Sequence, residues 1–322
     1  MYIPERLLEV YRKQGYHLAG RTGLVKPCHW LKKSLKTKGR EFCYKQKFYG
    51  IPSHRCLQIS LYPGCSQRCL YCWRVQPQDI GLSWNELQVT RDMLDDPEVL
   101  LRAMIAEHRR ILSGYKGHPE VDLKMWEEAM NPVHLTPSLV GEPTLLGAEY
   151  LSSLFETAFS MGFKTVFLVT NGNFPEVLER LDTEPSQLYI SLSAPDEETY
   201  KKVCRPLLPD GWQRILRSLE LLDSFRCPTV VRITLVRGLN MKDFRAYAKI
   251  LKKANPTYIE PKAAMALGYF RKRLPIDSMP RHEEIKRFAL GLAKELGYNV
   301  LDESLHSRVV LLSRLEKPIR FY

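Results

Sequence analysis

The chain lacks the segments that would place it in or across a membrane. None of its apolar runs approaches the roughly 20 residues that span a bilayer. Residues 1–15 contain Glu5 and Glu9 but no continuous apolar segment of the kind found in secretory signals. The chain also contains no internal repeat and no low-complexity segment. We therefore expect a cytoplasmic globular protein with no membrane partner.

Acidic residues are scarce in the first 50 positions. This segment holds three Glu against twelve Lys or Arg, so it carries +9 of the formal net charge of +12. Such a cluster attracts nucleic acid through charge neutralisation and counterion release. Four aromatic side chains among the charges are candidate stacking platforms for bases: Trp30, Tyr44, Phe48 and Tyr49. A solvated basic arm would explain the charge alone equally well.

Short β-rich runs alternate with amphipathic helical stretches from residue 56 onward, which is typical of βα units that build a parallel sheet. Six runs are predicted strands: 56–62, 133–140, 164–171, 187–193, 229–236 and 257–264. Five stretches are predicted helices: 96–114 (with Asp96 as the N-cap), 144–162, 209–224, 242–254 and 279–297. This alternation predicts an α/β protein with a partial (β/α)6 barrel and a C-terminal extension in residues 56–322. Residues 1–55 form a separate N-terminal extension in this interpretation, and residues 75–95 form a loop over one mouth of the barrel.

Two of the predicted strands have one polar face. Gln187, Ser191 and Ser193 alternate with apolar residues, and Arg232 and Thr234 do so in the next strand. Helices cover the outside of such a barrel, so the polar faces are predicted to point inward. Buried polar groups need partners, and a bound ligand would provide them. A hydrated face is the alternative.

Cysteines in the cytoplasm stay reduced, so we expect no disulfides among the eight. Cys65, Cys69 and Cys72 form a C-x3-C-x2-C run directly after the first predicted strand. Three thiolates bind three irons of a [4Fe–4S] cubane and leave the fourth iron without a protein ligand. That open iron is suited to chelate S-adenosylmethionine (SAM) and to pass the electron that splits it into a 5′-deoxyadenosyl radical. A structural zinc site is disfavoured because it prefers four ligands.

Other residues complete this interpretation of the cysteine motif. Tyr71, just before the last cysteine, is a candidate to pack on the adenine of SAM. Cys204 and Cys227 stand apart from the other cysteines and are expected to be small buried hydrophobic residues.

The chain resembles the radical SAM superfamily at this motif and further downstream. Gly141, Glu142 and Pro143 follow the second predicted strand like the superfamily's GEP motif, whose backbone and acid meet the ammonium group of SAM. The resemblance places contacts to the ribose and carboxylate of SAM at the ends of later strands: Asn171, Ser191 or Ser193, and Arg232 or Thr234.

A second set of cysteines lies upstream, at Cys28, Cys43 and Cys56, with spacings that by themselves fit scattered packing residues. The segments around and after them are similar, in order, to the tRNA 4-demethylwyosine synthase family: CYKQKFYGI, SHRC, CWR, GEPTLL, LVTNG, SLSAPDEETYKKVCRPL, LVRGLN, GYFRKRL and MPRHEEI. The resemblance implies a second [4Fe–4S] cluster with an open iron on these three cysteines. It also implies a Schiff base between pyruvate and Lys45, which without this context is read as a solvated lysine. Ser193 departs from the family pattern, because we expect relatives to have Asp there.

The resemblance further implies the reaction. N1-methylguanosine in tRNA-Phe, beside the anticodon, and pyruvate would give 4-demethylwyosine, a tricyclic base, by way of the SAM-derived radical. Lys47 and Arg40 are candidates to lower the pKa of Lys45. An external electron donor and a monomeric chain are expected. Candidate tRNA contacts near the barrel mouth, which solvated loop charges would explain equally well, are Gln76, Arg271, Lys272 and Arg273.

Two alternatives remain open at this point. A radical SAM enzyme could act on a peptide or small molecule, with the second cluster serving electron transfer, but the basic N-terminal segment disfavours it. A non-catalytic iron–sulfur or zinc protein could bind RNA, but such a protein has no need of the GEP motif or a polar barrel interior.

Overall fold

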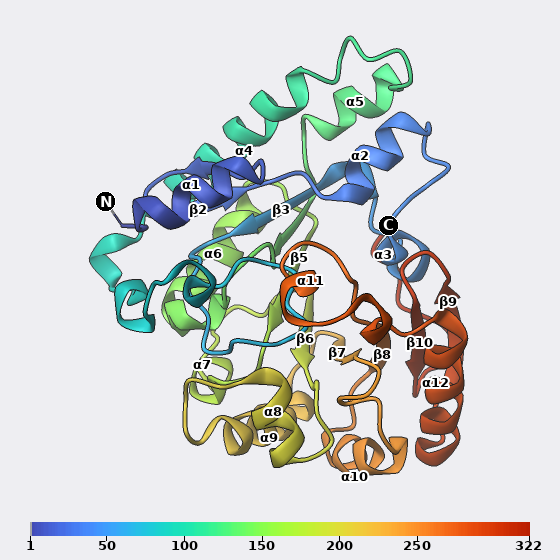
Figure 1. The fold of residues 1–322 in the computed structure, drawn as a ribbon. Helices are drawn as coiled ribbons and strands as arrows, with labels where there is room; N and C mark the ends of the chain where they lie inside the picture. The colour runs from blue at the N-terminus through green and yellow to red at the C-terminus, as the bar shows by residue number, and fades with distance from the viewer. Residues whose placement is uncertain (1) are drawn as a thin grey trace.

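A parallel sheet forms the centre of the computed structural model, which describes residues 2–322 (Figure 1). Its six strands lie in chain order: β3 (Cys56–Ser60), β4 (His134–Pro137), β5 (Thr165–Thr170), β6 (Gln187–Ser191), β7 (Thr229–Leu235) and β8 (Tyr258–Ala263). Each strand lies within one of the six predicted runs. The prediction of six consecutive parallel strands is therefore confirmed.

Four further strands extend this sheet on both sides, and the sequence analysis missed them. β1 (His17–Ala19) pairs antiparallel with β2 (Gly23–Val25), which pairs antiparallel with β3. At the other side, β10 (Val309–Ser313) lies between β8 and β9 (Asn299–Ser304), antiparallel to both. The sheet is thus an open, ten-stranded one. The strands β1 and β2 are three residues long, too short for alternation to be detected.

Helices occupy all five segments with helical periodicity: α4 (Pro97–Ser113), α6 (Ala148–Ser160), α9 (Gly211–Glu220), α10 (Phe244–Ala254) and α12 (His282–Leu296). Asp96 caps α4 as predicted, because its carboxylate accepts a hydrogen bond of 2.9 Å from the backbone N–H of Glu98. The remaining helices are α1 (Glu5–Lys13), α2 (His29–Lys36), α3 (Tyr44–Tyr49), α5 (Leu123–Ala129), α7 (Pro175–Glu179), α8 (Glu197–Cys204) and α11 (Phe270–Arg273).

The segment 75–95 contains three short 3₁₀ helices, at Pro77–Ile80, Trp84–Leu87 and Arg91–Met93. It packs beside the cysteine motif, since the side-chain amide of Gln76 donates to the carbonyl of Cys69 at 3.0 Å. Its position over a barrel mouth stays a prediction.

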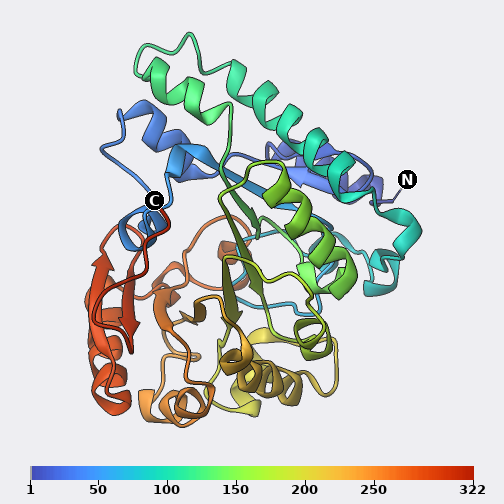
Figure 2. The same cartoon turned by 180° about the vertical axis from the view of Figure 1, so that it is seen from behind.

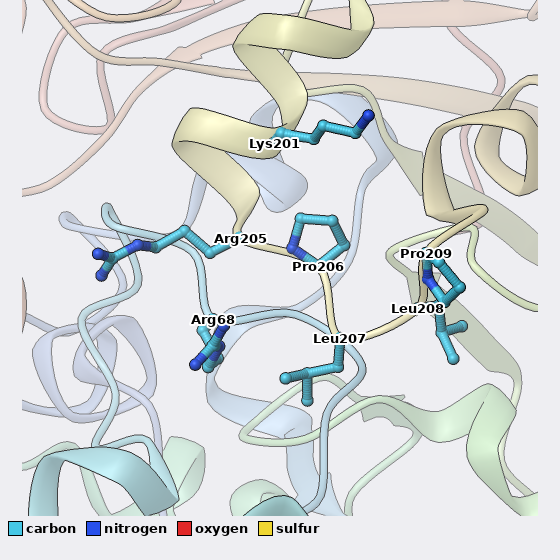
Figure 3. Close-up of a pocket in the computed structure, with 7 residues that line it drawn as sticks. All are labelled: Arg68, Lys201, Arg205, Pro206, Leu207, Leu208 and Pro209. Atoms are coloured by element: carbon cyan, nitrogen blue, oxygen red, sulfur yellow. The ribbon is translucent and has the colours of Figure 1, made fainter.

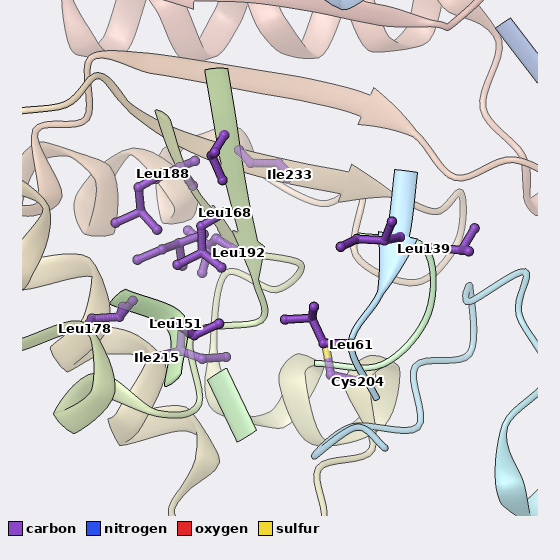
Figure 4. Close-up of a cluster of buried hydrophobic side chains, with 14 of the residues drawn as sticks. Leu61, Leu139, Leu151, Leu168, Leu178, Leu188, Leu192, Cys204, Ile215 and Ile233 are labelled. Atoms are coloured by element: carbon purple, nitrogen blue, oxygen red, sulfur yellow. The ribbon is translucent and has the colours of Figure 1, made fainter. Parts of the chain in front are cut away.

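The two faces of the parallel strands pack into different clusters. Leu188, Ile190, Val231 and Ile233 belong to the main hydrophobic core, together with residues of α6, α9 and α10. Figure 4 shows part of this core, including Leu168, Leu188 and Ile233 from three neighbouring strands. This face is the helix-covered outside of the barrel.

The opposite face of the same strands carries the predicted polar residues, and aromatic side chains lie among them. Phe167, Tyr189, Val230 and Tyr258 form a second cluster with residues of α3. Gln187 is completely buried, and its side-chain amide donates to the hydroxyl of Tyr189 at 2.9 Å. The inward direction of the polar face is therefore confirmed, with an aromatic component that the sequence analysis did not include.

The N-terminal extension packs directly on this sheet. Phe48 and Tyr49 of α3 are fully buried in the inner cluster, against Phe167 of β5. The boundary after residue 55 stays a prediction. Across residues 2–322, the structure contains no helix of the length and apolarity needed to cross a membrane.

Candidate active site

The first cysteine motif lies in the cluster loop, residues 63–75, which follows β3. Burial raises the pKa of Cys65, and the charges of Glu142 and Cys69 raise it further. Burial also raises the pKa of Cys72, and the charge of Cys69 adds to this effect. The three thiols are therefore close enough for the charge of one to raise the pKa of another.

In residues 2–322, no three side chains of Cys, His, Asp or Glu converge on the position of a single metal ion. A cubane does not require such convergence, because each thiolate binds its own iron, and three neighbouring half-buried thiols fit that arrangement.

Backbone hydrogen bonds and one arginine side chain hold the cluster loop in place. The N–H groups of Arg68 and Leu70 donate to the carbonyls of Cys204 and Val203, at 3.0 and 2.9 Å. From α11, the guanidinium of Arg273 donates to the carbonyl of Cys72 and pairs with Asp79. The side chain of Arg273 is 9% exposed. Its guanidinium is bonded to the cluster loop and to Asp79, which disfavours it as a tRNA contact.

Of the other candidate tRNA contacts, two are bonded to groups of the protein itself and one extends from the surface. Gln76 is bonded to the cluster loop, and the guanidinium of Arg271 donates to the carbonyl of Ala266 at 2.7 Å. Lys272 lies over the ring of Tyr269 at 4.3 Å and is exposed. Of this set, Lys272 is the side chain best placed to meet a phosphate.

The GEP segment packs against the start of the cluster loop. Gly141 has φ +85°, and a Cβ at this position would overlap the carbonyl oxygen of Tyr62, so glycine is required. The N–H of Glu142 donates to the carbonyl of Gly64 at 2.8 Å. Pro143 is buried at the start of the 3₁₀ helix Pro143–Leu146. This segment and the cysteine motif therefore form one unit.

The carboxylate of Glu142 binds groups of the protein itself. Oε1 accepts hydrogen bonds of 2.6 Å from the hydroxyls of Thr144 and Thr170. Oε2 accepts one of 2.7 Å from the N–H of Asn171. Burial raises the pKa of Glu142, and these hydrogen bonds oppose that effect. The acid thus joins the segment after β4 to the end of β5, while its contact with SAM stays a prediction.

Two further predicted SAM contacts lie beside the cluster loop. The side-chain amide of Asn171 donates to the hydroxyl of Ser66 at 2.9 Å and lies 3.7 Å from the sulfur of Cys65. The hydroxyl of Tyr71 lies 2.7 Å from that of Ser193. The residue that departs from the family pattern therefore contacts the cluster loop directly. Ser191 and Thr234 are half-buried on the inner face.

Arg232, also a predicted SAM contact, is already bonded within the barrel. Its guanidinium pairs with the fully buried carboxylate of Glu260 on β8 at 2.8 Å and donates to the hydroxyl of Tyr44. The hydroxyls of Tyr49 and Tyr189 also donate to Glu260, at 2.8 and 3.2 Å. Both charges thus have several partners, as buried ions require.

Sequence reasoning missed two residues of this polar interior, Glu260 and Lys262. Burial and the charge of Arg232 lower the pKa of Lys262 to about 8. Both residues alternate with Ile259 and Pro261 in the predicted strand 257–264, so the same period of two that revealed Arg232 could have found them.

The second cysteine set comes together from three elements. Cys28 and Cys43 are the N-cap residues of α2 and α3, and Cys56 begins β3. Burial and the charge of Cys28 raise the pKa of Cys43 to about 11. The charges of Cys28 and Cys43 likewise raise the pKa of Cys56, which burial raises most. Three residues spread over 29 positions therefore form one half-buried group of thiols, as a second cubane requires.

Lys45 lies in this group, at the start of α3. Its Nζ lies 4.8 Å from the ring centre of Phe167 and 5.2 Å from that of Tyr189. Burial lowers the pKa of Lys45, and the charge of Arg232 lowers it further, whereas those of Cys56 and Cys43 raise it.

The structure corrects the expected source of the cationic effect on Lys45. Lys47 forms an ion pair with Asp302 at 2.6 Å, and Arg40 donates to the carbonyl of Thr37 at 3.1 Å. The largest effect of a positive charge on Lys45 comes instead from Arg232 of β7, which is distant in sequence.

A six-stranded parallel sheet with three thiols beyond its first strand and a GEP segment beyond its second defines the radical SAM class. The radical SAM superfamily model matches residues 59–251, and a model described as wyosine base formation matches residues 253–314. The chain is a radical SAM enzyme. It belongs to the family of S-adenosyl-L-methionine-dependent tRNA 4-demethylwyosine synthases.

Relatives from archaea and eukaryotes carry this family name. The Pyrococcus horikoshii protein is 49% identical over 97% of this chain and 90% of its own length. The Methanocaldococcus jannaschii protein is 39% identical over 98% of both. The Mus musculus protein is 37% identical over 96% of this chain, which spans 42% of that longer relative.

Two solved structures have the same fold over nearly the whole chain. A structure of TYW1 with a lysine–pyruvate adduct bound has a TM-score of 0.84 and 36% identity, and it covers 99% of this chain and 100% of the other. A crystal structure of archaeal TYW1 has a TM-score of 0.77 and 34% identity over 98% and 99% of the two chains. The predicted partial barrel of the radical SAM class is therefore confirmed.

Proposed function

We propose that this chain converts N1-methylguanosine in tRNA-Phe and pyruvate into 4-demethylwyosine. One observation carries the proposal: Lys45 lies among Cys28, Cys43 and Cys56 and faces the inner side of the barrel. A radical SAM enzyme needs three thiolates for SAM cleavage, and this chain has a second, half-buried group of three. The second group with a lysine fits a co-substrate that has both a carbonyl and a carboxylate, as pyruvate does.

The first site comprises Cys65, Cys69 and Cys72 with the residues that position SAM. A [4Fe–4S] cluster on these thiolates, with SAM, supplies a 5′-deoxyadenosyl radical when both are bound. Gly141 allows the GEP backbone to approach the cluster loop, and Glu142 joins the segment after β4 to the end of β5. The proposed contacts to SAM are Tyr71, Pro143, Asn171, Ser191, Ser193, Arg232 and Thr234.

The second site comprises Cys28, Cys43 and Cys56 as ligands of a second [4Fe–4S] cluster, together with Lys45. A neutral amine is needed to attack the keto carbon of pyruvate, and burial together with the charge of Arg232 favours the neutral form. Addition followed by loss of one water forms an imine. The lysine–pyruvate adduct bound in the related TYW1 structure supports this role for Lys45.

The RNA-binding side of the proposal rests on charge and exposure. The first 50 residues carry a net charge of +9, and the exposed ring of Trp73 directly follows the cluster ligand Cys72. An aromatic ring at this place is suited to stack on an RNA base. The target base must leave its own stack at a cost of a few kcal/mol, and these contacts would offset part of it. We further propose that the chain acts as a monomer in the cytoplasm and takes its electrons from an external donor.

Anaerobic reconstitution tests the proposal directly. The protein is given SAM, a reductant, pyruvate and N1-methylguanosine-containing tRNA-Phe, and the digested tRNA is analysed by mass spectrometry for the tricyclic nucleoside. The product is expected with the unmodified chain and is expected to be lost in Lys45→Ala and Cys43→Ala. Lys47→Ala is the matched control, because this lysine is paired with Asp302 at the surface and should retain activity. Formation of 5′-deoxyadenosine with unchanged tRNA would overturn the wyosine assignment and leave the radical SAM class intact.

A further inference from the structure

A basic hollow lies behind the cluster loop and takes no part in the function proposed above. It has a volume of about 410 Å³ and is lined by Arg68, Lys201, Arg205 and the Pro206–Pro209 turn (Figure 3). All of its lining residues belong to the described part of the chain, and none of them is acidic. Its surface therefore combines three cations with a small apolar floor.

The hollow is connected to the first cysteine motif by a short path. Arg68 directly precedes Cys69. Segment 66–70 pairs with segment 203–207 through four backbone hydrogen bonds. The N–H of Arg68 donates to the carbonyls of Cys204 at 3.0 Å and Arg205 at 3.3 Å, that of Leu70 to Val203 at 2.9 Å, and that of Leu207 to Ser66 at 2.9 Å. The cluster loop thus contributes Arg68 to the lining of the hollow, and the paired segment contributes Arg205, Pro206 and Leu207.

The arginines of the hollow have no partner of their own. Within residues 2–322, neither Arg68 nor Arg205 has a side-chain hydrogen bond, ion pair or aromatic contact, and the Nε of Arg68 is buried without an acceptor. A buried donor without an acceptor costs free energy that a ligand could recover. Lys201 has one exposed partner, Glu197, at 2.8 Å.

The backbone of Arg205 adds a second observation. Its φ of +48° lies in the left-handed region, at the C-cap of α8, where glycine or asparagine is favoured. Glycine fits this backbone conformation, so Arg205→Gly removes the guanidinium without straining the C-cap.

We propose that this hollow is the docking site of an acidic one-electron carrier protein that reduces the cluster held by Cys65, Cys69 and Cys72. In each encounter the carrier loses one electron and the cluster gains one. Electron tunnelling weakens steeply with distance, so a carrier has to dock close to a cluster ligand, and Arg68 is one residue from Cys69. Carriers of this kind form small, transient interfaces steered by opposite charge.

The position of the hollow favours a carrier over tRNA. Figures 1 and 2 place α8 at the end of the molecule opposite α2, and α2 belongs to the basic N-terminal segment. Two basic surfaces on opposite ends are suited to two different anionic partners. A carrier in the hollow would therefore leave the N-terminal segment free for tRNA.

The test compares two electron sources for SAM cleavage in the reconstituted holoenzyme without tRNA. Reduced flavodoxin, an acidic protein, is one source, and dithionite is the other. Arg205→Gly removes a charge and suits the left-handed backbone, and Lys201→Ala removes a second charge. Lys38→Gly is the matched control, because Lys38 is exposed, has φ +52° and lies in the N-terminal basic segment.

The double variant Arg205→Gly/Lys201→Ala is expected to lower kcat/KM for flavodoxin by about three- to tenfold, with a weaker dependence on salt. Its rate with dithionite should equal that of the unmodified enzyme, and Lys38→Gly should change neither rate. An unchanged flavodoxin rate would overturn the proposal, and so would an equal loss with dithionite. Weaker tRNA binding in the double variant, with normal reduction, would assign the hollow to RNA instead. The readout is 5′-deoxyadenosine, so the outcome depends on the radical SAM class and not on the wyosine assignment.

Discussion

Arg232 and Glu260 occupy paired register positions on the neighbouring parallel strands β7 and β8, and their side chains form an ion pair of 2.8 Å inside the barrel. The carboxylate of Glu260 is fully buried and also accepts hydrogen bonds from Tyr49 of α3 and Tyr189 of β6. This pair links the N-terminal extension to the barrel. Its positive member, Arg232, is the cation that lowers the pKa of Lys45.

Glu260→Gln is expected to destabilise the fold by about 3 kcal/mol, because it leaves the guanidinium of Arg232 without its counter-ion in a buried setting. Urea unfolding of the unmodified and variant proteins measures this difference. Glu295→Gln is the control, since Glu295 pairs with Lys252 at the surface and should change stability by less than about 1 kcal/mol. A small effect at Glu260 would mean that the tyrosines alone hold this part of the barrel.

Gly141→Ala is expected to abolish SAM cleavage, because its Cβ would overlap the carbonyl oxygen of Tyr62 and force the GEP segment away from the cluster loop. The measurements are iron content and 5′-deoxyadenosine formation. Gly147→Ala is a closely matched control, since Gly147 has φ +83° and nothing lies within 4 Å of the position that its added methyl group would occupy. It should cost about 1–3 kcal/mol of backbone strain and retain cleavage. Equal losses in both variants would show that strain, and not the close approach, decides the effect.

Removal of one cysteine set at a time should separate the two proposed clusters. Replacement of Cys28, Cys43 and Cys56 by Ala is expected to halve the iron content and stop ring formation while SAM cleavage continues. Replacement of Cys65, Cys69 and Cys72 should halve the iron content and stop both. Iron analysis and the two products provide the readouts, with Cys227→Ala as a control outside both sets. Full iron in the first triple variant would exclude a cluster at that site.

His108 of α4 is expected to make stability sensitive to acid. Burial lowers its pKa to about 4, and its Nε2–H donates to the carbonyl of Ala129 at 3.0 Å. The unfolded chain binds a proton here below about pH 6.5, whereas the folded protein does so only below about pH 4. The stability due to neutral His108 is thus complete above about pH 6.5 and is lost as the pH falls toward 4.

Urea unfolding at pH 7.5 and 5.5 measures this loss, which is expected to be about 1 kcal/mol for His108 at the lower pH. His108→Gln keeps a donor for the Ala129 carbonyl and should remove that part of the pH dependence. Burial also lowers the pKa of His134, so some acid sensitivity is expected to remain in this variant. An identical pH dependence in the two proteins would contradict the role of His108.

The sequence revealed most of the parallel sheet because each strand carries its own periodicity. The alternation in 187–193 and 229–236 also predicted correctly which residues point inward, because successive side chains in a strand point to opposite faces of the sheet. The antiparallel strands β1, β2, β9 and β10 were missed. They contain three to six residues, and their pairing depends on the neighbouring strand more than on their own composition.

In the candidate site, too, the features set by local spacing were predicted, and those set by distant contacts were not. Cys65, Cys69 and Cys72 lie within eight residues, so their grouping is set by local spacing. The internal partners of Arg273 were not predicted, because its charge is visible in the sequence, whereas Asp79 and Cys72 are about 200 positions away. The basic hollow at Arg68 and Arg205 was missed because it forms only where two distant segments pair.

The sequence by itself determined the class of fold, the first cysteine motif and the family, because these depend on local periodicity and on the order of short motifs. Only the tertiary structure decided that Lys45 lies beside three thiols from α2, α3 and β3, and that Arg232 of β7 lowers its pKa. The physical reason is that burial and charge act through space. They depend on which segments the fold brings together, and no local pattern in the chain specifies that.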